Sequence, residues 1–138
     1  MLNQLFAVAL SAAMAAGAGY ANPSKATVKI PVTRTEATSG KQMYTAYCAP
    51  CHGTDGKGSG PYAGALKTRP TDLTQLSRAH NGRYPDTHVV ATLQDGTHDQ
   101  DVMPAWGPIL GKMSQTNSQE RLLRISNLSR FIETLQSK

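Results

Sequence analysis

The last quarter of the chain has the clearest alternation of apolar and polar positions. An apolar stripe is formed by Leu122, Ile125, Leu128, Ile132 and Leu135, with Phe131 beside it. Spacings of three and four residues place these side chains on one face of an α-helix. Asn117 and Glu120, just before the main part of the stripe, have the spacing of an N-terminal capping pair. The pattern therefore predicts a long amphipathic helix at the end of the sequence.

Three shorter helices are predicted from capping residues and local composition. Ser39 is the expected N-cap of a helix over residues 40–49. Thr71 is the expected cap of a short helix that reaches residue 76. Asp86 begins a third helix, and Gly96 follows its end, where glycine commonly terminates a helix.

Proline and glycine mark the segments between these helices. Residues 22–38 contain Pro23 and Pro31 and are expected to form an extended arm, because proline excludes them from a central strand. Residues 53–60 contain four glycines, which predicts a loop folded closely against a ligand. A phosphate-binding loop would need a preceding strand and a Gly-Lys-Ser/Thr ending, and both are missing. With no other strand signal, we expect an all-α fold.

The segment Cys48-Ala49-Pro50-Cys51-His52 indicates a specific chemistry. Cys-x-x-Cys-His is the attachment sequence for c-type heme. Two thiols at this spacing on a helical turn can each form a thioether with one heme vinyl group. The adjacent His52 then lies beneath the ring, where its imidazole can bind the iron as an axial ligand. One such motif predicts one covalently bound heme c.

Two other interpretations of these cysteines remain open. Cys48 and Cys51 also have the spacing of a thioredoxin-type redox pair, although the preceding residues 39–47 read as a helix and not as a buried strand. A zinc site would need a further ligand pair at matched spacing, and His80, His88 and His98 do not provide one.

Composition fits a cofactor-filled interior. The 138 residues are enough for one domain, and Leu, Ile, Val and Phe are scarce for a conventional core. The net charge is +5, with a basic stretch after the motif that contains Lys57, Lys67, Arg69, Arg78 and Arg83. Two roles remain open for it: a positive rim that steers an acidic redox partner, or a solvated loop that neutralises heme propionates. Dispersed basic residues and few aromatics do not indicate nucleic-acid binding.

The first 21 residues resemble a secretory signal peptide. They contain no charged side chain, an apolar run and small residues suited to cleavage, although the usual Lys or Arg at the start is missing. An uncleaved membrane anchor is the alternative. We expect a signal peptide over residues 1–21, the extended arm over 22–38 and one domain over 39–138. Export to the periplasm, without stable membrane insertion after cleavage, agrees with c-type heme attachment, which takes place outside the bacterial cytoplasm.

A second axial ligand is expected from the segment over residues 102–108. Met103 lies there between prolines and a glycine, in a stretch predicted to be rigid and non-helical. Its thioether sulfur could bind the iron. His98, five residues earlier, is the competing ligand, because imidazole also binds heme iron.

These features together resemble the class I cytochrome c family over about residues 40–135. The residues that carry the resemblance are Gly40, Tyr44, Cys48, Cys51, His52, Met103 and Pro104, followed by the amphipathic last helix. The resemblance implies three to five helices wrapped around one covalently attached heme. It also implies that Gly40 allows the first and last helices to cross closely, with Phe131 or Leu128 packed there.

The resemblance also assigns roles around the heme. A proline carbonyl would orient His52, and both Pro61 and Pro70 fit that role; Trp106 would pack at the ring edge. The implied function is single-electron transfer between redox proteins, as a free carrier or a subunit of a respiratory or dehydrogenase complex, and not catalysis. The alternatives are a thiol-disulfide oxidoreductase using Cys48 and Cys51, and a five-coordinate heme protein with peroxidase or gas-binding activity.

Overall fold

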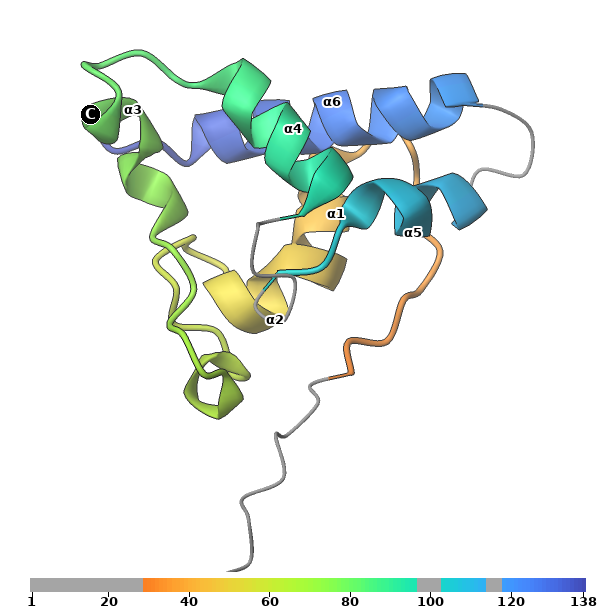
Figure 1. Ribbon diagram of the computed structural model, residues 1–138, viewed down its shortest axis with the longest axis horizontal. Helices are drawn as coiled ribbons and strands as arrows, with labels where there is room; N and C mark the ends of the chain where they lie inside the picture. Colours follow the sequence, from red (N-terminus) through yellow and green to blue (C-terminus); the bar gives the residue numbers. More distant parts are fainter. Residues whose placement is uncertain (1–28, 97–102, 114–117) are drawn as a thin grey trace, which may run out of the picture.

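The computed structural model describes residues 29–96, 103–113 and 118–138, and within these ranges it contains helices and loops but no strand (Figure 1). The α-helices are α1 (Gly40–Met43), α2 (Ala49–His52), α3 (Leu76–Ala79), α4 (Asp86–Asp95), α5 (Trp106–Met113) and α6 (Ser118–Thr134). A π-helical turn, Tyr44–Cys48, joins α1 to α2, and Ala63–Ala65 and Leu73–Gln75 are 3₁₀ turns. The predicted all-α fold is confirmed.

The helix before the motif is longer than predicted. Ser39 caps it as expected, because its Oγ accepts a hydrogen bond from the Gln42 amide at 3.2 Å. Instead of ending at residue 49, helical structure continues through the π turn and α2 to His52. Gly53, at φ 81°, then ends it in a conformation that favours glycine. The extension matters because it places the whole heme motif on a helical frame.

The close crossing of the first and last helices is confirmed at Gly40. A Cβ atom at this position would collide with the backbone of Asn127 on α6 and lie 2.9 Å from the Phe131 Cβ. Beside this crossing, the Tyr44 and Phe131 rings pack with centroids 5.1 Å apart. Glycine therefore allows the α1 backbone to lie directly against α6.

The buried face of α6 agrees with the predicted stripe at Ile125, Leu128 and Ile132. Leu122 does not, because 48% of its surface is exposed. It lies in the first turns of α6, on a side that the neighbouring helices leave uncovered. Helical spacing predicts which residues share a face, but burial also requires an element packed against that turn. Asn117, the predicted capping partner of Glu120, lies outside the described residues.

Two local predictions are wrong for reasons of hydrogen bonding and geometry. The cap after Pro70 is Asp72 and not Thr71, because the Asp72 carboxylate accepts the Thr74 amide at 2.9 Å. The segment predicted to be non-helical through residue 108 becomes helical at Trp106. Proline is tolerated in the first turn of a helix, where backbone amides have no partner within the helix. The helix from Asp86 to Asp95, ended by Gly96 at φ 78°, is confirmed.

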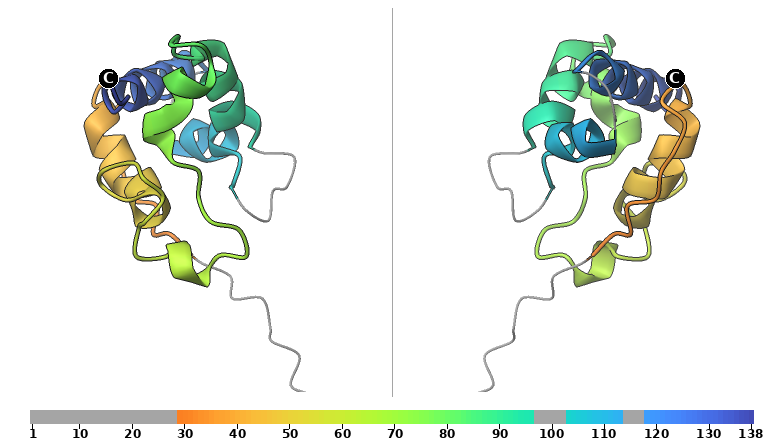
Figure 2. Two further views of the ribbon diagram at one scale, coloured as in Figure 1. Left: turned by 90° about the vertical axis from the view of Figure 1, so that its left-hand side faces the viewer. Right: turned by 90° about the vertical axis from the view of Figure 1, so that its right-hand side faces the viewer.

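The elements are arranged around a cavity. Figure 2 shows α6 across one end, the α1–α2 segment along one side, and α4 and α5 on the other. In the view of Figure 1, the loop between α2 and α3 extends away from α6 and returns along the same side of the molecule. In the described part of the chain, no helix combines the length and apolar character needed to cross a membrane.

Candidate functional site

A cavity of about 700 Å³ lies between α2, α4, the start of α5 and the segment around Pro70. This volume falls within the usual range for cofactor and small-molecule sites. The predicted site residues that line it are Cys48, Cys51, His52, Pro70, Met103 and Trp106. Folding thus brings the heme motif together with a methionine about fifty residues later in the sequence. Pro61 does not line the cavity and is exposed.

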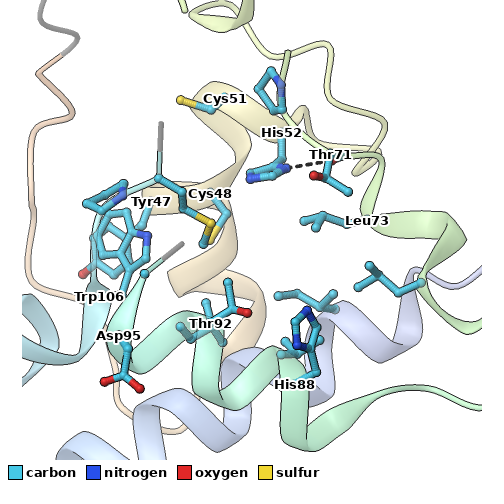
Figure 3. Close-up of a pocket in the computed structure, with 18 of the residues that line it drawn as sticks. Tyr47, Cys48, Cys51, His52, Thr71, Leu73, His88, Thr92, Asp95 and Trp106 are labelled. Carbon is cyan, nitrogen blue, oxygen red and sulfur yellow. Dashed lines mark hydrogen bonds between the residues drawn. The ribbon is translucent and has the colours of Figure 1, made fainter. Parts of the chain in front are cut away.

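The three motif residues come from the end of the first helical segment (Figure 3). Cys48 ends the π turn and is buried, whereas Cys51 and His52 lie on α2 and are half-buried. Neither cysteine is in a disulfide. Two thiols and one imidazole therefore line the same cavity within five residues of sequence.

The protonation of the thiols argues against the redox-pair interpretation. Burial, together with a smaller effect of the neighbouring Cys51, raises the pKa of the Cys48 thiol to about 12. Burial also raises the pKa of the Cys51 thiol. Disulfide exchange needs a reactive thiolate, which redox cysteines obtain through a lowered pKa. The environment of Cys48 and Cys51 instead raises the thiol pKa and disfavours the thiolate.

His52 is oriented by a backbone carbonyl. Its Nδ1 atom lies 3.0 Å from the carbonyl oxygen of Thr71. A neutral imidazole that donates its Nδ1 proton to this carbonyl leaves the Nε2 lone pair available for a metal. Burial lowers the pKa of His52, and the hydrogen bond to Thr71 acts in the other direction. Burial thus favours the neutral ring, which is the metal-binding form.

The prediction that a proline carbonyl orients His52 is wrong by one residue. Neither Pro61 nor Pro70 supplies the acceptor, because the bond goes to Thr71. The Pro70 carbonyl instead lies against Gly58, so closely that a Cβ atom on Gly58 would collide with it. The two successive carbonyls therefore face different partners, with Pro70 against Gly58 and Thr71 against His52. Pro70 itself is buried in the cavity wall.

Met103 and Trp106 reach the cavity from the segment that enters α5. Met103 is half-buried, and its carbonyl oxygen would lie 3.2 Å from a Cβ atom placed on Gly96. Gly96 therefore allows this segment to pass close to the end of α4. Trp106 is 4% exposed and stacks on Tyr47, with ring centroids 5.3 Å apart and planes inclined by 26°. His98, the competing ligand, lies outside the described residues.

Several lining residues were missed by sequence reasoning. Among them are Ile30, Tyr47, Leu73, His88 and Thr92. In Figure 3, Tyr47 and Trp106 lie on one side of the cavity and Thr71 and Leu73 on the other, with His88 and Thr92 on α4. Tyr47 directly precedes Cys48, and this adjacency is the signal that could have found it. Ile30 carries no such signal, because it belongs to the arm.

The basic stretch is exposed at all five of its predicted residues, and one of them, Arg69, also lines the cavity. Asp72 is an acidic residue within this basic stretch of the sequence. Hydrogen bonding by the Thr74 hydroxyl lowers the pKa of Asp72, and the nearby charges of Lys57 and Arg69 lower it further. Positive charge therefore surrounds one ionised carboxylate close to the cavity.

The donor set of this cavity fits a c-type heme. The two thiols match its two covalent attachment points, and a neutral imidazole and a thioether are both established ligands of heme iron. The lining is otherwise largely apolar, with Trp106, Leu73, Val89 and Leu93 among its members, which suits a large flat ring.

The all-α fold and this cavity define a cytochrome c domain, a class of protein that transfers electrons through heme. The chain belongs to the family described as cytochrome c oxidase, cbb3-type, subunit III, whose model matches residues 35–119. This match covers more than half of the chain and includes the heme motif, Met103 and Trp106.

The chain is also similar to a solved structure from Kuenenia stuttgartiensis, the reducing HAO-like protein complex Kustc0457/Kustc0458. The sequences are 24% identical, and the TM-score is 0.42. The similarity covers 75% of this chain and 45% of that chain, so this chain spans less than half of its length. No curated protein matches the sequence.

Proposed function

We propose that this protein is a periplasmic single-electron carrier that holds one covalently attached heme c. The observation that carries the proposal is the meeting of Cys48, Cys51, His52 and Met103 at one cavity. When bound, the heme supplies a reversible one-electron iron couple. The residues around it attach it, hold its iron and exclude water.

Each of the four residues has a distinct role in this proposal. Cys48 and Cys51 form the two thioethers. His52 binds the iron through Nε2, while its Nδ1 proton is held by the Thr71 carbonyl. Met103 is the second axial ligand, supported by its place in the cavity lining three residues before Trp106. With both axial positions filled, the iron has no free site for a substrate, so we propose a carrier and not an enzyme.

Export supports the same function. The uncharged, apolar first 21 residues are the proposed signal peptide, followed by the arm over 22–38 and the domain over 39–138. Heme attachment then takes place in the periplasm, where the protein exchanges electrons with other redox proteins. The protein acts either as a free carrier or as the cytochrome subunit of a respiratory or dehydrogenase complex.

The proposed docking surface is the basic stretch near the cavity. Arg69 lines the cavity, and Lys57, Lys67, Arg78 and Arg83 are exposed on the segments around it. A positive rim would attract a partner with an acidic surface and raise the rate of productive encounter.

Mass spectrometry of the protein purified from the periplasm tests covalent attachment. We expect the mature chain to carry the mass of one heme, and Cys51→Ala to yield little protein, with at most one thioether. Normal yields of doubly linked heme from Cys51→Ala would contradict the proposal. A wild-type mass lower by two hydrogens, as in a disulfide, would instead favour the redox pair.

Optical spectroscopy tests the iron ligands separately. We expect the ferric protein to show the near-infrared sulfur-to-iron band, and Met103→Ala to lose it. Met43→Leu is a matched control, because Met43 is buried on α1 and does not line the cavity. An unchanged band in Met103→Ala would show that Met103 is not the ligand.

A further inference from the structure

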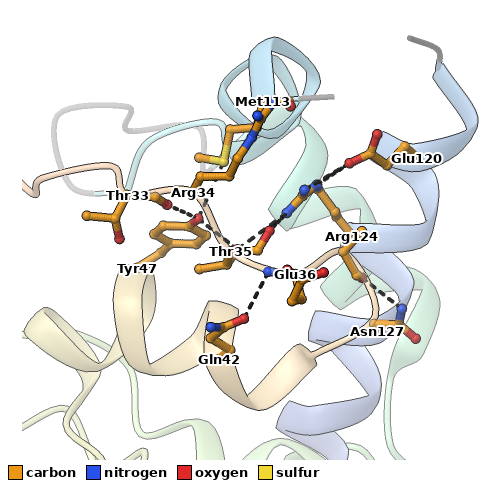
Figure 4. A network of polar contacts seen from close by, with 11 residues as sticks. Thr33, Arg34, Thr35, Glu36, Gln42, Tyr47, Met113, Glu120, Arg124 and Asn127 are labelled. Atoms are coloured by element: carbon orange, nitrogen blue, oxygen red, sulfur yellow. Dashed lines mark hydrogen bonds and ion pairs between the residues drawn. The ribbon is translucent and has the colours of Figure 1, made fainter. Parts of the chain in front are cut away.

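The arm is bound to the helical domain by a network around one buried arginine (Figure 4). Arg124 on α6 is 3% exposed and forms an ion pair with Glu120 at 2.8 Å. Its Nη1 donates to the Thr35 carbonyl at 2.9 Å. About one turn further along α6, the side-chain amide of Asn127 donates through Nδ2 to the Ala37 carbonyl at 3.0 Å. The arm is therefore attached to α6 over a stretch of its backbone.

Burial of Arg124 makes this attachment energetically important. A buried guanidinium is costly unless its donors are paired. Glu120 and Thr35 together accept from three of its nitrogens, namely Nε, Nη1 and Nη2. Release of the arm would remove the Thr35 acceptors and leave part of a buried charge without a partner. The docked position of the arm is consequently favoured.

The same arm residues hold the hydroxyl of Tyr47. This hydroxyl donates to the Thr33 carbonyl and lies 2.8 Å from Thr35 Oγ1. Arg124 Nη1 lies 3.3 Å from the same Thr35 oxygen. Donation can thus run in one direction, from Arg124 to Thr35, from Thr35 to Tyr47, and from Tyr47 to Thr33. Hydrogen bonds aligned in this way polarise and strengthen one another.

Tyr47 connects this network to the cavity. Its ring lines the cavity and stacks on Trp106, which lines it too. Trp106 lies three residues after Met103 and begins α5. The arm also reaches the cavity directly, because Ile30 is among the lining residues. Through Tyr47 and Trp106, the arm therefore supports the segment that carries Met103 into α5.

We propose that the arm is a working part of the cofactor site. Thr33 and Thr35 position Tyr47, and Tyr47 positions Trp106, so that the wall beside Met103 stays closed. Tyr47 is a positioning residue that acts through Trp106. The proposal moves the functional boundary of the domain from residue 39 back to about residue 30. It rests on the proposed function only for the identity of the group in the cavity.

Cyanide binding to the ferric holoprotein is the first test, because in the proposed function cyanide displaces Met103 from the iron. Tyr47→Phe keeps the ring and removes the hydroxyl. We expect it to bind cyanide about fivefold faster than the wild type, the factor that corresponds to the loss of one typical hydrogen bond. Thr35→Val should have a similar effect, and Thr35→Ser, which keeps the hydroxyl, should restore the wild-type rate.

Tyr84→Phe is the matched control. The Tyr84 hydroxyl donates to the Ser129 carbonyl on α6 at 2.9 Å, so this variant also loses a hydrogen bond of a tyrosine hydroxyl, but Tyr84 does not line the cavity. We expect a comparable loss of stability and an unchanged rate of cyanide binding. If cyanide binding were accelerated equally in Tyr84→Phe and Tyr47→Phe, the cause would be a general loss of stability, and the inference would be overturned. A wild-type rate of cyanide binding in Tyr47→Phe would overturn it too.

Hydrogen–deuterium exchange gives a second reading that does not depend on the iron ligand. Tyr47→Phe should increase exchange in the arm and in the first turn of α5, whereas Tyr84→Phe should leave both segments unchanged. Unchanged exchange in Tyr47→Phe would overturn the inference. If Met103 proved not to be the iron ligand, that result would contradict the proposed function. The inference about the arm would still be tested by the exchange comparison, which does not involve the iron.

Discussion

The Nδ1 atom of His52 lies 3.0 Å from the carbonyl oxygen of Thr71, nineteen residues later in the chain. This contact closes the glycine-rich loop. The Gly58 amide donates to the His52 carbonyl at 2.8 Å, and the Leu73 amide donates to the Gly56 carbonyl at 2.7 Å. The orientation of the predicted iron ligand thus depends on how this loop folds back over α2.

Gly58 is the position where this loop is most sensitive to substitution. Its φ is 76°, and a Cβ atom would collide with the Pro70 carbonyl next to Thr71. We expect Gly58→Ala to lower the free energy of unfolding by about 2–4 kcal/mol, from the left-handed conformation together with the collision. Urea denaturation of the holoprotein measures this loss, and the yield of holoprotein should fall with it.

Gly64→Ala is the control for this substitution. No atom lies within 4 Å of a Cβ atom at Gly64, and its φ is not in the left-handed region. We expect its effect to stay within about 0.5 kcal/mol. Equal effects of the two substitutions would mean that the packing of Gly58 against Pro70 does not hold the loop.

The helix crossing at Gly40 makes a second prediction. Gly40→Ala adds a methyl group against the Asn127 backbone, where no flexible side chain can move aside. We expect a loss of about 1–3 kcal/mol in unfolding free energy, measured by urea denaturation. Lys41→Ala, at the exposed neighbouring position, should change stability by no more than about 0.5 kcal/mol. An unchanged free energy of unfolding in Gly40→Ala would show that α1 and α6 are further apart than this contact requires.

The proposed basic rim predicts a dependence on salt. Arg69→Glu should slow electron transfer to a negatively charged redox partner roughly two- to threefold at low ionic strength, because it reverses a charge at the cavity. The difference from the wild type should shrink as salt is added and charges are screened. Stopped-flow kinetics at several salt concentrations measure both effects.

Lys112→Glu is the control for Arg69→Glu. It reverses an exposed charge on α5, which lies on the other side of the molecule from the loop between α2 and α3 in Figure 1. We expect it to have a smaller effect at every salt concentration. Rates that do not depend on ionic strength, or equal effects of the two reversals, would remove the rim as a docking surface.

Tyr84 predicts how stability depends on alkaline pH. Burial raises the pKa of Tyr84 to about 12, whereas an unfolded tyrosine titrates near its ordinary value of 10.0. Because the fold favours the neutral phenol, the stability from Tyr84 is fully present below pH 10.0 and is lost as the pH rises toward about 12. The stability difference between wild type and Tyr84→Phe should therefore be smaller at pH 11 than at pH 9, measured by urea denaturation. A constant difference would contradict this linkage.

Local signals predicted the helices well. Ser39 caps the first helix as expected, Gly96 ends α4, and the stripe at Ile125, Leu128 and Ile132 is buried. Each of these features depends on neighbours within a turn or two of helix, where sequence spacing determines which groups meet. Leu122 was predicted incorrectly because its exposure depends on where the other helices end.

The parts of the site that sequence reasoning missed depend on contacts between distant segments. Thr71 replaced the predicted proline as the partner of His52, because the direction of one carbonyl depends on the path of the whole loop. Ile30 joins the cavity lining because the arm lies along the domain, whereas its proline-containing sequence predicted only an extended shape. The hydrogen bonds of the Tyr47 hydroxyl to the same arm likewise depend on this long-range packing.

The sequence by itself determined the chemistry available to this protein: two thiols, an imidazole and a thioether of the kinds that c-type heme uses, within a helical chain. The tertiary structure decided which groups surround one cavity, which carbonyl holds His52, and that the arm supports Tyr47 and Trp106. The physical reason is that covalent spacing fixes residue types and local hydrogen bonds. Cavities and long-range hydrogen bonds form only when segments far apart in the chain pack together.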